Sequence, residues 1–257
     1  MTQEITEETQ PLVSPLIEMS AEADPIAYDY ATSNGVQLES TADGRTFTLW
    51  WAPDDFNPET DTVLVTLHGH AAWATNAFTA WHTELQKRHF AFLSLQWWMG
   101  ESLEVNGYIK HDELYGYLLE GLEAHNIEPG RIIFEGFSMG SAATFIVSAQ
   151  DQQKEEPYFN VIIANSGVLE LSEPYNASIA HGDYGEQPYE GTHWILYCGM
   201  LDEEHENWCK QMEATEEWLK RMGATIDLFI EDPTGKHSGM MAPQNKEKVM
   251  DTAESLL

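Results

Sequence analysis

The pattern Gly136-x-Ser138-x-Gly140 constrains the fold of this 257-residue chain more than any other stretch. It follows the apolar run 132–134 and precedes the small-residue run 141–149, so the order predicts a buried strand, a sharp turn and a helix. A serine at such a turn takes strained dihedrals that lift its hydroxyl clear of the backbone. The chain then passes so close that the positions two before and two after it have room for little more than glycine.

Apolar, strand-like runs alternate with helical patterns five times after residue 60. This alternation predicts an α/β fold, with a mostly parallel sheet covered by helices on both faces. Residues 35–52 instead form two short runs around Ala42-Asp43-Gly44, which predicts an antiparallel hairpin at one edge. The expected strands are 62–67, 90–95, 132–134, 160–165, 193–198 and 224–230, and the expected helices are 76–88, 112–125, 141–149, 203–222 and part of 242–256.

The first 25 residues differ from the rest of the chain. They are acidic and polar and contain Pro11, Pro15 and Pro25, which predicts a flexible arm followed by a single domain over residues 26–257. No apolar run approaches the ~18 residues of a membrane-spanning helix. The start also lacks the basic-then-apolar layout of a signal peptide, so a cytoplasmic chain and the mature form of a secreted one both stay open.

The charge balance excludes some partners. With 43 acidic and 12 basic residues, the net charge is −31. Such a chain is repelled by nucleic acid and by anionic membranes, so we expect neither as a partner. A well-solvated acidic surface and an adaptation to high salt both explain the balance, and neither bears on the fold. The sequence does not indicate an oligomeric state.

Cys198 and Cys209 are the two cysteines of the chain. Two cysteines do not make a disulfide scaffold, and their spacing matches no zinc pattern. A bridge between them is one alternative, but two buried thiols are the favoured expectation.

Side chains at the carboxyl ends of parallel strands are the candidates for chemistry. Ser138 needs a neutral imidazole to take its proton and a carboxylate to orient that imidazole. His237 follows the last expected strand, in a loop of small and turn-forming residues, and is the expected base. Asp202 follows the strand that ends at residue 198 and is the expected acid, although it could instead cap the helix expected at 203–222. The alternative acids are Glu203 and, less favoured, Glu170.

Two backbone N–H groups are expected to stabilise an oxyanion. The first belongs to Met139, the residue after the serine. The second is expected from the turn after the strand 62–67, at His70 with Ala71 as the alternative. His68 and His70 could also be read as a metal pair, but no carboxylate or cysteine stands beside them, so we expect no metal.

Four short stretches together resemble the α/β-hydrolase superfamily: Leu67-His68-Gly69-His70, Gly136-Phe137-Ser138-Met139-Gly140, Gly199-Met200-Leu201-Asp202 and Lys236-His237. The chain is most similar to the small esterase branch with dienelactone-hydrolase-like, feruloyl-esterase-like and polyhydroxybutyrate-depolymerase-like enzymes, over roughly residues 35–255. The resemblance implies a serine hydrolase without a cofactor that acts through an acyl-enzyme. The oxyanion turn departs from the glycine-rich run of hormone-sensitive-lipase-like esterases.

The segment 167–191 is too short for a full cap domain, so a fairly open pocket is expected. Aromatic side chains in loops could line it, since aromatic walls suit acyl groups, aryl groups and sugar rings. The candidates are Trp73, Trp97, Trp98 and, less favoured than Trp97 and Trp98, Tyr184 and Tyr189. The negative field of the chain favours neutral substrates.

These observations predict an enzyme that hydrolyses small, neutral carboxylic esters with Ser138, His237 and Asp202. A serine peptidase or an acyltransferase would use the same residues. A non-catalytic binding protein on the same fold is the alternative from another class, because a fold does not guarantee an activity.

Overall fold

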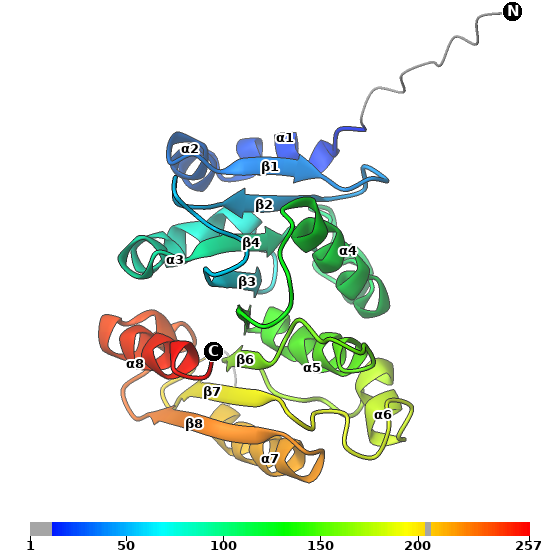
Figure 1. Ribbon diagram of the computed structural model, residues 1–257. Helices are drawn as coiled ribbons and strands as arrows, with labels where there is room; N and C mark the ends of the chain where they lie inside the picture. Colours follow the sequence, from blue (N-terminus) through cyan, green and yellow to red (C-terminus); the bar gives the residue numbers. More distant parts are fainter. Residues whose placement is uncertain (1–11, 204–206) are drawn as a thin grey trace, which may run out of the picture.

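The computed structural model describes residues 12–203 and 207–257. Figure 1 shows a central twisted sheet with helices packed against both of its faces. Within the described residues the sheet has eight strands in the order β1-β2-β4-β3-β5-β6-β7-β8. The strands are β1 (Gln37–Ser40), β2 (Phe47–Trp51), β3 (Val63–Leu67), β4 (Ala91–Leu95), β5 (Ile132–Phe137), β6 (Val161–Asn165), β7 (His193–Gly199) and β8 (Thr225–Asp232).

The pairing of the strands confirms the expected α/β class. β1 and β2 form the predicted antiparallel hairpin, and β2 pairs antiparallel with β4. All other neighbours are parallel. β3, β4 and β6 are buried along their whole length, as expected of parallel strands with both faces covered.

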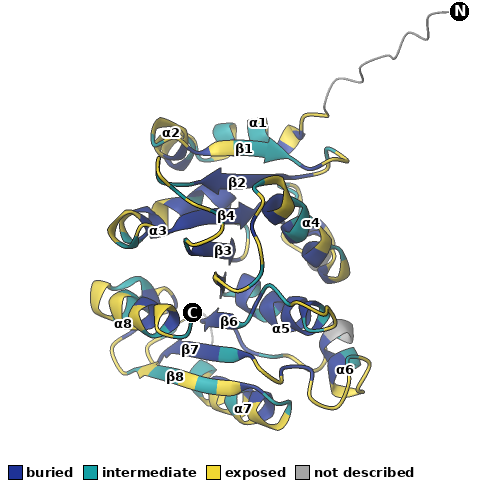
Figure 2. Ribbon diagram, in the orientation of Figure 1, coloured by how far each residue is buried: buried dark blue, intermediate teal, exposed yellow. Residues whose placement is uncertain are grey.

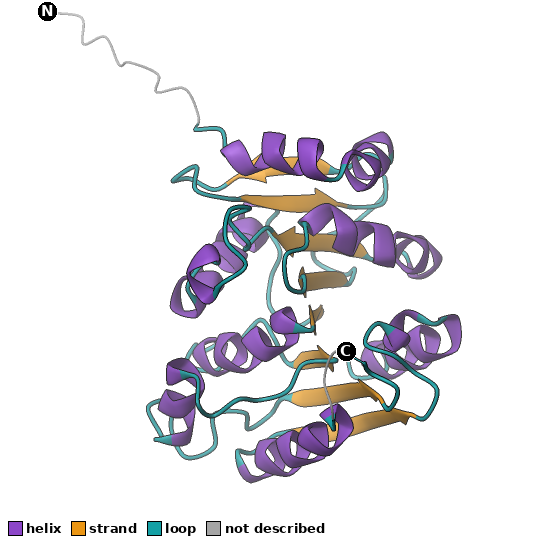
Figure 3. Ribbon diagram, turned by 180° about the vertical axis from the view of Figure 1, so that it is seen from behind, coloured by secondary structure: helices purple, strands orange, loops and turns teal. Residues whose placement is uncertain are grey.

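Eight α-helices in the described residues cover the sheet: α1 (Pro15–Ala23), α2 (Pro25–Ser33), α3 (Ala74–Arg88), α4 (His111–Ala124), α5 (Met139–Asp151), α6 (Pro174–Ala180), α7 (Trp208–Arg221) and α8 (Pro243–Glu254). Short 3-10 turns lie at Val105–Gly107 and Gly239–Met241. α4 and α5 lie on one face of the sheet, and α3 and α8 lie on the other (Figures 1 and 3).

Each face of the sheet has its own apolar core. On β5, Phe134 packs into one cluster with Leu118 and Phe145, whereas Ile133 packs into the other with Phe78. This division follows from the period of two along a strand, which sends neighbouring side chains to opposite faces. In Figure 2 the buried residues concentrate on the strands and on the helix faces turned toward them.

The expectation of a flexible arm over residues 1–25 is wrong for the second half of this segment. Pro15 and Pro25 do not break the chain but begin α1 and α2. Ser14 and Asp24 cap these helices, accepting hydrogen bonds from nearby backbone N–H groups at 3.3 Å and 3.1 Å. Leu16 is only 2% exposed, so α1 packs on the domain. The rest of the arm, residues 1–11, lies outside the described residues.

The helix expected at 203–222 begins later, at Trp208. Asn207 precedes it in a left-handed conformation, with φ of 62°. Glu203 is therefore not in its first turn, and residues 204–206 lie outside the described residues. Asp202 is five residues ahead of Asn207, which excludes the alternative that it caps this helix.

The connection between β6 and β7 contains the seven-residue helix α6. Among the described residues of this connection it is the one helix, which agrees with the expectation that a full cap domain is missing. In the parts of the chain that the structure describes, no helix is both long enough and apolar enough to cross a membrane.

Cys198 and Cys209 form a disulfide, which corrects the expectation of two free thiols. α7 packs against β7, so the first turn of the helix brings Cys209 to the end of the strand. The Cα atoms are 5.3 Å apart, within the range that a disulfide needs. The bridge closes the loop that carries Asp202.

Replacing both cysteines with alanine should lower the free energy of unfolding by about 2–4 kcal/mol, because the cross-link restricts the unfolded chain. Urea denaturation of both proteins measures this difference. A reducing agent should lower the stability of the original chain and leave that of the variant unchanged. Equal stability of the two proteins without reductant would contradict the bond.

Candidate active site

Ser138 stands at the turn between β5 and α5, as the sequence predicted. Its φ of 56° and ψ of −117° lie in a region that non-glycine residues rarely adopt. The flanking glycines explain how the turn is accommodated. A Cβ on Gly136 would lie 2.3 Å from the carbonyl oxygen of Gly140, and a Cβ on Gly140 would lie 2.1 Å from that of Leu67.

A continuous hydrogen-bonded chain runs from Ser138 through His237 to Asp202. Nε2 of His237 lies 2.8 Å from the Ser138 hydroxyl oxygen. Nδ1 of the same ring lies 2.6 Å from a carboxylate oxygen of Asp202. The side chain of Asp202 is 1% exposed and that of His237 is 11% exposed, so both are shielded from water. Ser138 itself is half-buried and accessible.

Backbone contacts between two loops hold Asp202 close to His237. Asp202 follows β7, and His237 follows β8, which is the parallel neighbour of β7. The N–H of Met200 donates to the carbonyl of Asp232 at 2.8 Å, and the N–H of Leu201 donates to Gly235 at 2.9 Å. The two loops therefore leave the sheet side by side.

The alternative acids lie elsewhere. Glu203 forms a salt bridge with Lys236 at 3.0 Å, and both side chains are largely exposed. Glu170 is exposed in the loop after β6. Of the three candidate carboxylates, Asp202 is the one that the structure brings to His237.

The two expected oxyanion donors lie on either side of the turn at Ser138. Met139 is the first residue of α5, where helix N–H groups lack partners within the helix and the helix dipole is positive. His70 lies in the turn after β3, and the last residue of β3, Leu67, pairs with Gly136. The alternative donor, the N–H of Ala71, is engaged by the Tyr108 hydroxyl at 2.7 Å.

The imidazole of His68 shapes this turn from within. Its Nδ1–H donates to the carbonyl of Gly69 at 2.9 Å, and its Nε2 accepts from the N–H of Trp97 at 3.3 Å. Burial lowers the pKa of His68 to about 4, so the ring is neutral. His70 is exposed, with its Nε2 2.9 Å from the carbonyl of Leu103. In the described part of the chain, no group of three His, Cys, Asp or Glu residues could hold a metal ion.

The aromatic residues expected to line the pocket largely belong to the core. Trp97 is completely buried, and its indole N–H donates to the carbonyl of His68 at 2.9 Å. Trp73 is 5% exposed and packs against the half-buried Trp98 at 5.1 Å between ring centroids. The expectation is therefore wrong for Trp97 and Trp73, which support the loops from inside.

Tyr184 lies far from Ser138, which corrects the expectation that it lines the site. Its carbonyl accepts a hydrogen bond from Gln153 at 3.1 Å, just beyond the C-terminal end of α5. Ser138 is at the opposite end of this 13-residue helix, about 20 Å away at 1.5 Å per residue. Tyr189 is completely buried and donates to the carbonyl of Phe145, so it too is a core residue.

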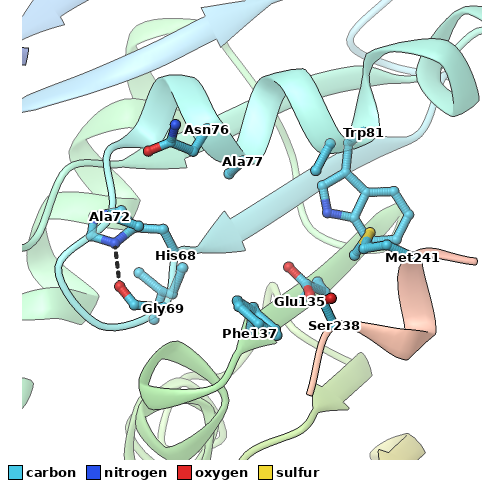
Figure 4. Close-up of a pocket in the computed structure, with 12 residues that line it drawn as sticks. His68, Gly69, Ala72, Asn76, Ala77, Trp81, Glu135, Phe137, Ser238 and Met241 are labelled. Atoms are coloured by element: carbon cyan, nitrogen blue, oxygen red, sulfur yellow. Dashed lines mark hydrogen bonds between the residues drawn. The ribbon is translucent and has the colours of Figure 1, made fainter. Parts of the chain in front are cut away.

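A cavity of about 220 Å³ lies on the α3 side of the sheet. Figure 4 shows Gly69, Phe137 and Ser238, which are neighbours of the site in sequence, around this cavity, together with Glu135 and Trp81. Small side chains on and before α3 leave the space open. They are Ala72, Ala77 and Ala80.

Glu135 is a buried carboxyl group that the sequence analysis did not single out. It is 2% exposed, and burial raises its pKa to about 7, against the effects of Asn165, Trp81 and Lys246. The amide of Asn165 donates to it at 3.0 Å. A charged residue within an otherwise apolar strand was the signal that could have identified it.

Asn165, the last residue of β6, and Ser166, which follows it, are two further polar residues beside the site that the sequence did not predict. The N–H of Ser138 donates to the carbonyl of Asn165 at 2.7 Å. The hydroxyl of Ser166 donates to the carbonyl of His237 at 2.6 Å. Their signal was two polar residues in a row at the end of a buried strand, at the edge where parallel sheets place functional groups.

The variant Glu135→Gln should become more stable relative to the original chain as the pH rises from 5 to 8. A folded-state pKa of about 7 lies above the ordinary 4.5, so the folded form binds the proton more tightly. The protonated Glu135 side chain therefore stabilises the original chain fully below pH 4.5, and this stabilisation is lost as the pH rises through 7. The free energy of unfolding of the original chain falls by at most about 3 kcal/mol over this range. Urea denaturation at each pH measures it, and a difference that does not vary with pH would contradict it.

We compared the sequence and the structure of the chain with those of known proteins. At the level of sequence, the chain matches no protein-family model and no curated protein. In structure it resembles the Francisella virulence factor BioJ, with a TM-score of 0.60 at 15% identity, over 95% of this chain and 96% of that one. A putative dienelactone hydrolase from Klebsiella pneumoniae gives a TM-score of 0.61 at 12% identity, over 86% of this chain and 96% of that one. Esterase B from Lactobacillus rhamnosis gives 0.62 at 13% identity, over 94% of each chain. With the strand order and the turn at Ser138, these similarities show that the chain has the α/β-hydrolase fold.

Proposed function

We propose that this protein is a serine hydrolase that cleaves small, neutral carboxylic esters through an acyl-enzyme. The observation that carries the proposal is the chain of hydrogen bonds from Ser138 to His237 at 2.8 Å and from His237 to Asp202 at 2.6 Å. Similar structures include proteins described as esterases, a carboxylesterase and a putative dienelactone hydrolase. They support an ester as the substrate, although at such low identity they do not identify it.

In the first half of the proposed reaction, the Ser138 hydroxyl oxygen attacks the ester carbonyl carbon. Nε2 of His237 takes the proton from the hydroxyl, and Asp202 stabilises the positive ring through Nδ1–H. The carbonyl oxygen becomes an oxyanion that accepts hydrogen bonds from the N–H groups of Met139 and His70. When the bond to the alcohol oxygen breaks, His237 returns its proton to the leaving alcohol.

In the second half, a water molecule replaces the alcohol. His237 takes a proton from the water as the water oxygen attacks the acyl carbon. The second tetrahedral intermediate uses the same two N–H groups, and its collapse returns the proton to Ser138 and releases the acid. No redox step or metal ion is needed for this sequence.

Two properties of the chain bear on the substrate. The cavity beside Ser138 is about 220 Å³, which is small among ligand pockets and suits a short acyl or alcohol group. The net charge of −31 repels anions, which favours neutral esters. A peptidase or an acyltransferase would use the same three residues, so the leaving group and the acceptor must be determined by assay.

The first test is the hydrolysis of short and medium-length p-nitrophenyl esters, together with labelling by a fluorophosphonate probe. We expect Ser138→Ala to abolish both turnover and labelling, because the variant lacks the nucleophile. Ser148→Ala is a matched control in the same helix. Among the described residues its buried hydroxyl has no hydrogen-bond partner, so its loss should leave both readouts intact. Folded protein that neither turns over an ester nor takes the label would favour a non-catalytic binding protein.

The second test concerns the acid. Asp202→Asn should lower kcat about a thousand- to ten-thousand-fold, because the amide no longer holds the productive tautomer of His237. Glu203→Gln, one residue further on, should leave kcat within about twofold, since an exposed pair with Lys236 contributes little. The opposite ranking of the two variants would assign the acid to Glu203.

A further inference from the structure

The end of β6 touches the nucleophile segment and the base segment at the same time. β6 is the parallel neighbour of β5, and Asn165 pairs in register with Phe137, the residue before Ser138. The carbonyl of Asn165 accepts the N–H of Ser138 at 2.7 Å. This bond satisfies a backbone donor at the point where the chain takes its strained turn.

The next residue, Ser166, reaches the other segment. Its hydroxyl donates to the backbone carbonyl of His237 at 2.6 Å, and its N–H donates to the carbonyl of Tyr197 at 3.0 Å. Ser166 is completely buried and has a φ of 55°. A non-glycine residue keeps such a conformation only where its surroundings enforce it.

The turn after β6 also packs closely against the backbone of Ser138. A Cβ on Gly167 would lie 2.1 Å from the carbonyl oxygen of Ser138. The hydroxyl of Ser141, in the first turn of α5, donates to the carbonyl of Gly167 at 2.9 Å. The turn after β6 is therefore packed against both ends of the nucleophile segment.

Glu135 anchors the side chain of Asn165. The Asn165 amide donates to the Glu135 carboxyl group at 3.0 Å, and the Ser166 hydroxyl lies 3.3 Å from the Asn165 amide oxygen. All three residues are at most 2% exposed. Buried polar networks of this kind hold their members in one arrangement, because an unsatisfied member costs free energy.

We propose that Asn165 and Ser166 form a buried clasp that fixes the position of His237 relative to Ser138, with Glu135 as its anchor. The clasp rests on the proposed serine-hydrolase function. Asn165 and Ser166 are completely buried and do not line the cavity, so they are positioning residues. Their effect is on the geometry of proton transfer, where a displacement of about 1 Å can cost a hundredfold in rate.

Ser166→Ala tests the clasp with little other change, since alanine also carries a Cβ at the same positive φ. We expect kcat for a p-nitrophenyl ester to fall about 10- to 100-fold with KM within about twofold. Hydrogen exchange should become faster in the segment 233–241, which contains His237. Ser20→Ala is the matched control, because Ser20 is also completely buried and donates to a backbone carbonyl, that of Ile17 at 2.8 Å. It should leave kcat and exchange in 233–241 unchanged.

A second pair of variants tests the anchor, and also serves if Ser166→Ala does not fold. Glu135→Gln keeps an acceptor for Asn165, whereas Glu135→Leu removes it, so hydrogen exchange in the segment 233–241 should be faster in Glu135→Leu than in Glu135→Gln. Equal exchange of this segment in the two variants would contradict the role of the anchor.

The outcomes separate the clasp from the proposed function. Ester turnover by the original chain, with unchanged kcat and exchange in Ser166→Ala, would overturn the clasp alone. Faster exchange throughout Ser166→Ala, with no excess in 233–241, would also overturn it, because the serine would then act only on overall stability. A folded original chain without turnover or fluorophosphonate labelling would overturn the proposed function. The exchange comparison needs no turnover and would still decide whether the clasp holds the His237 segment.

Discussion

The site depends on the strained backbone of Ser138. A φ of 56° at a residue with a side chain costs about 1–3 kcal/mol, which the surrounding structure must offset. The bond from its N–H to Asn165 supports it on one side. On the other, the absence of side chains at Gly136 and Gly140 lets α5 begin directly against the end of β3. This contact also sets Ser138 beside the turn that carries His70.

The order of the strands brings His237 and Asp202 to the turn at Ser138. Ser138 and His237 are 99 residues apart in the chain, and His237 and Asp202 are 35 apart. They meet because β5, β6, β7 and β8 are successive parallel neighbours, so the loops after them leave the same edge of the sheet. β6 lies between the strand that leads to Ser138 and those that lead to Asp202 and His237, and its end is therefore where a contact to both sides can form.

Buried carboxyl groups of this acidic chain have different roles. Asp151 accepts hydrogen bonds from the N–H groups of Tyr158 and Phe159 and from the Tyr115 hydroxyl, and so ties the end of α5 to the following loop. Asp202 pairs with His237. Glu135 has its pKa raised by burial and lies beside the cavity next to Ser138. Removing a carboxylate from water is unfavourable, so each of these positions shows where specific contacts compensate for burial.

The sequence by itself determined the fold class, the turn at Ser138 and the expectation that His237 and Asp202 would act with it. These features depend on local patterns, namely the period of apolar residues, glycines at a close approach and the order of residues after strands. Ser14 and Asp24, which precede Pro15 and Pro25 and cap the two helices, were local signals for α1 and α2. Only the tertiary structure decided which Trp residues are buried, that Cys198 and Cys209 are bonded, and that Asn165 and Ser166 join the two halves of the site. Those properties depend on which distant segments pack together, and a pattern within one segment carries no information about its neighbours in space.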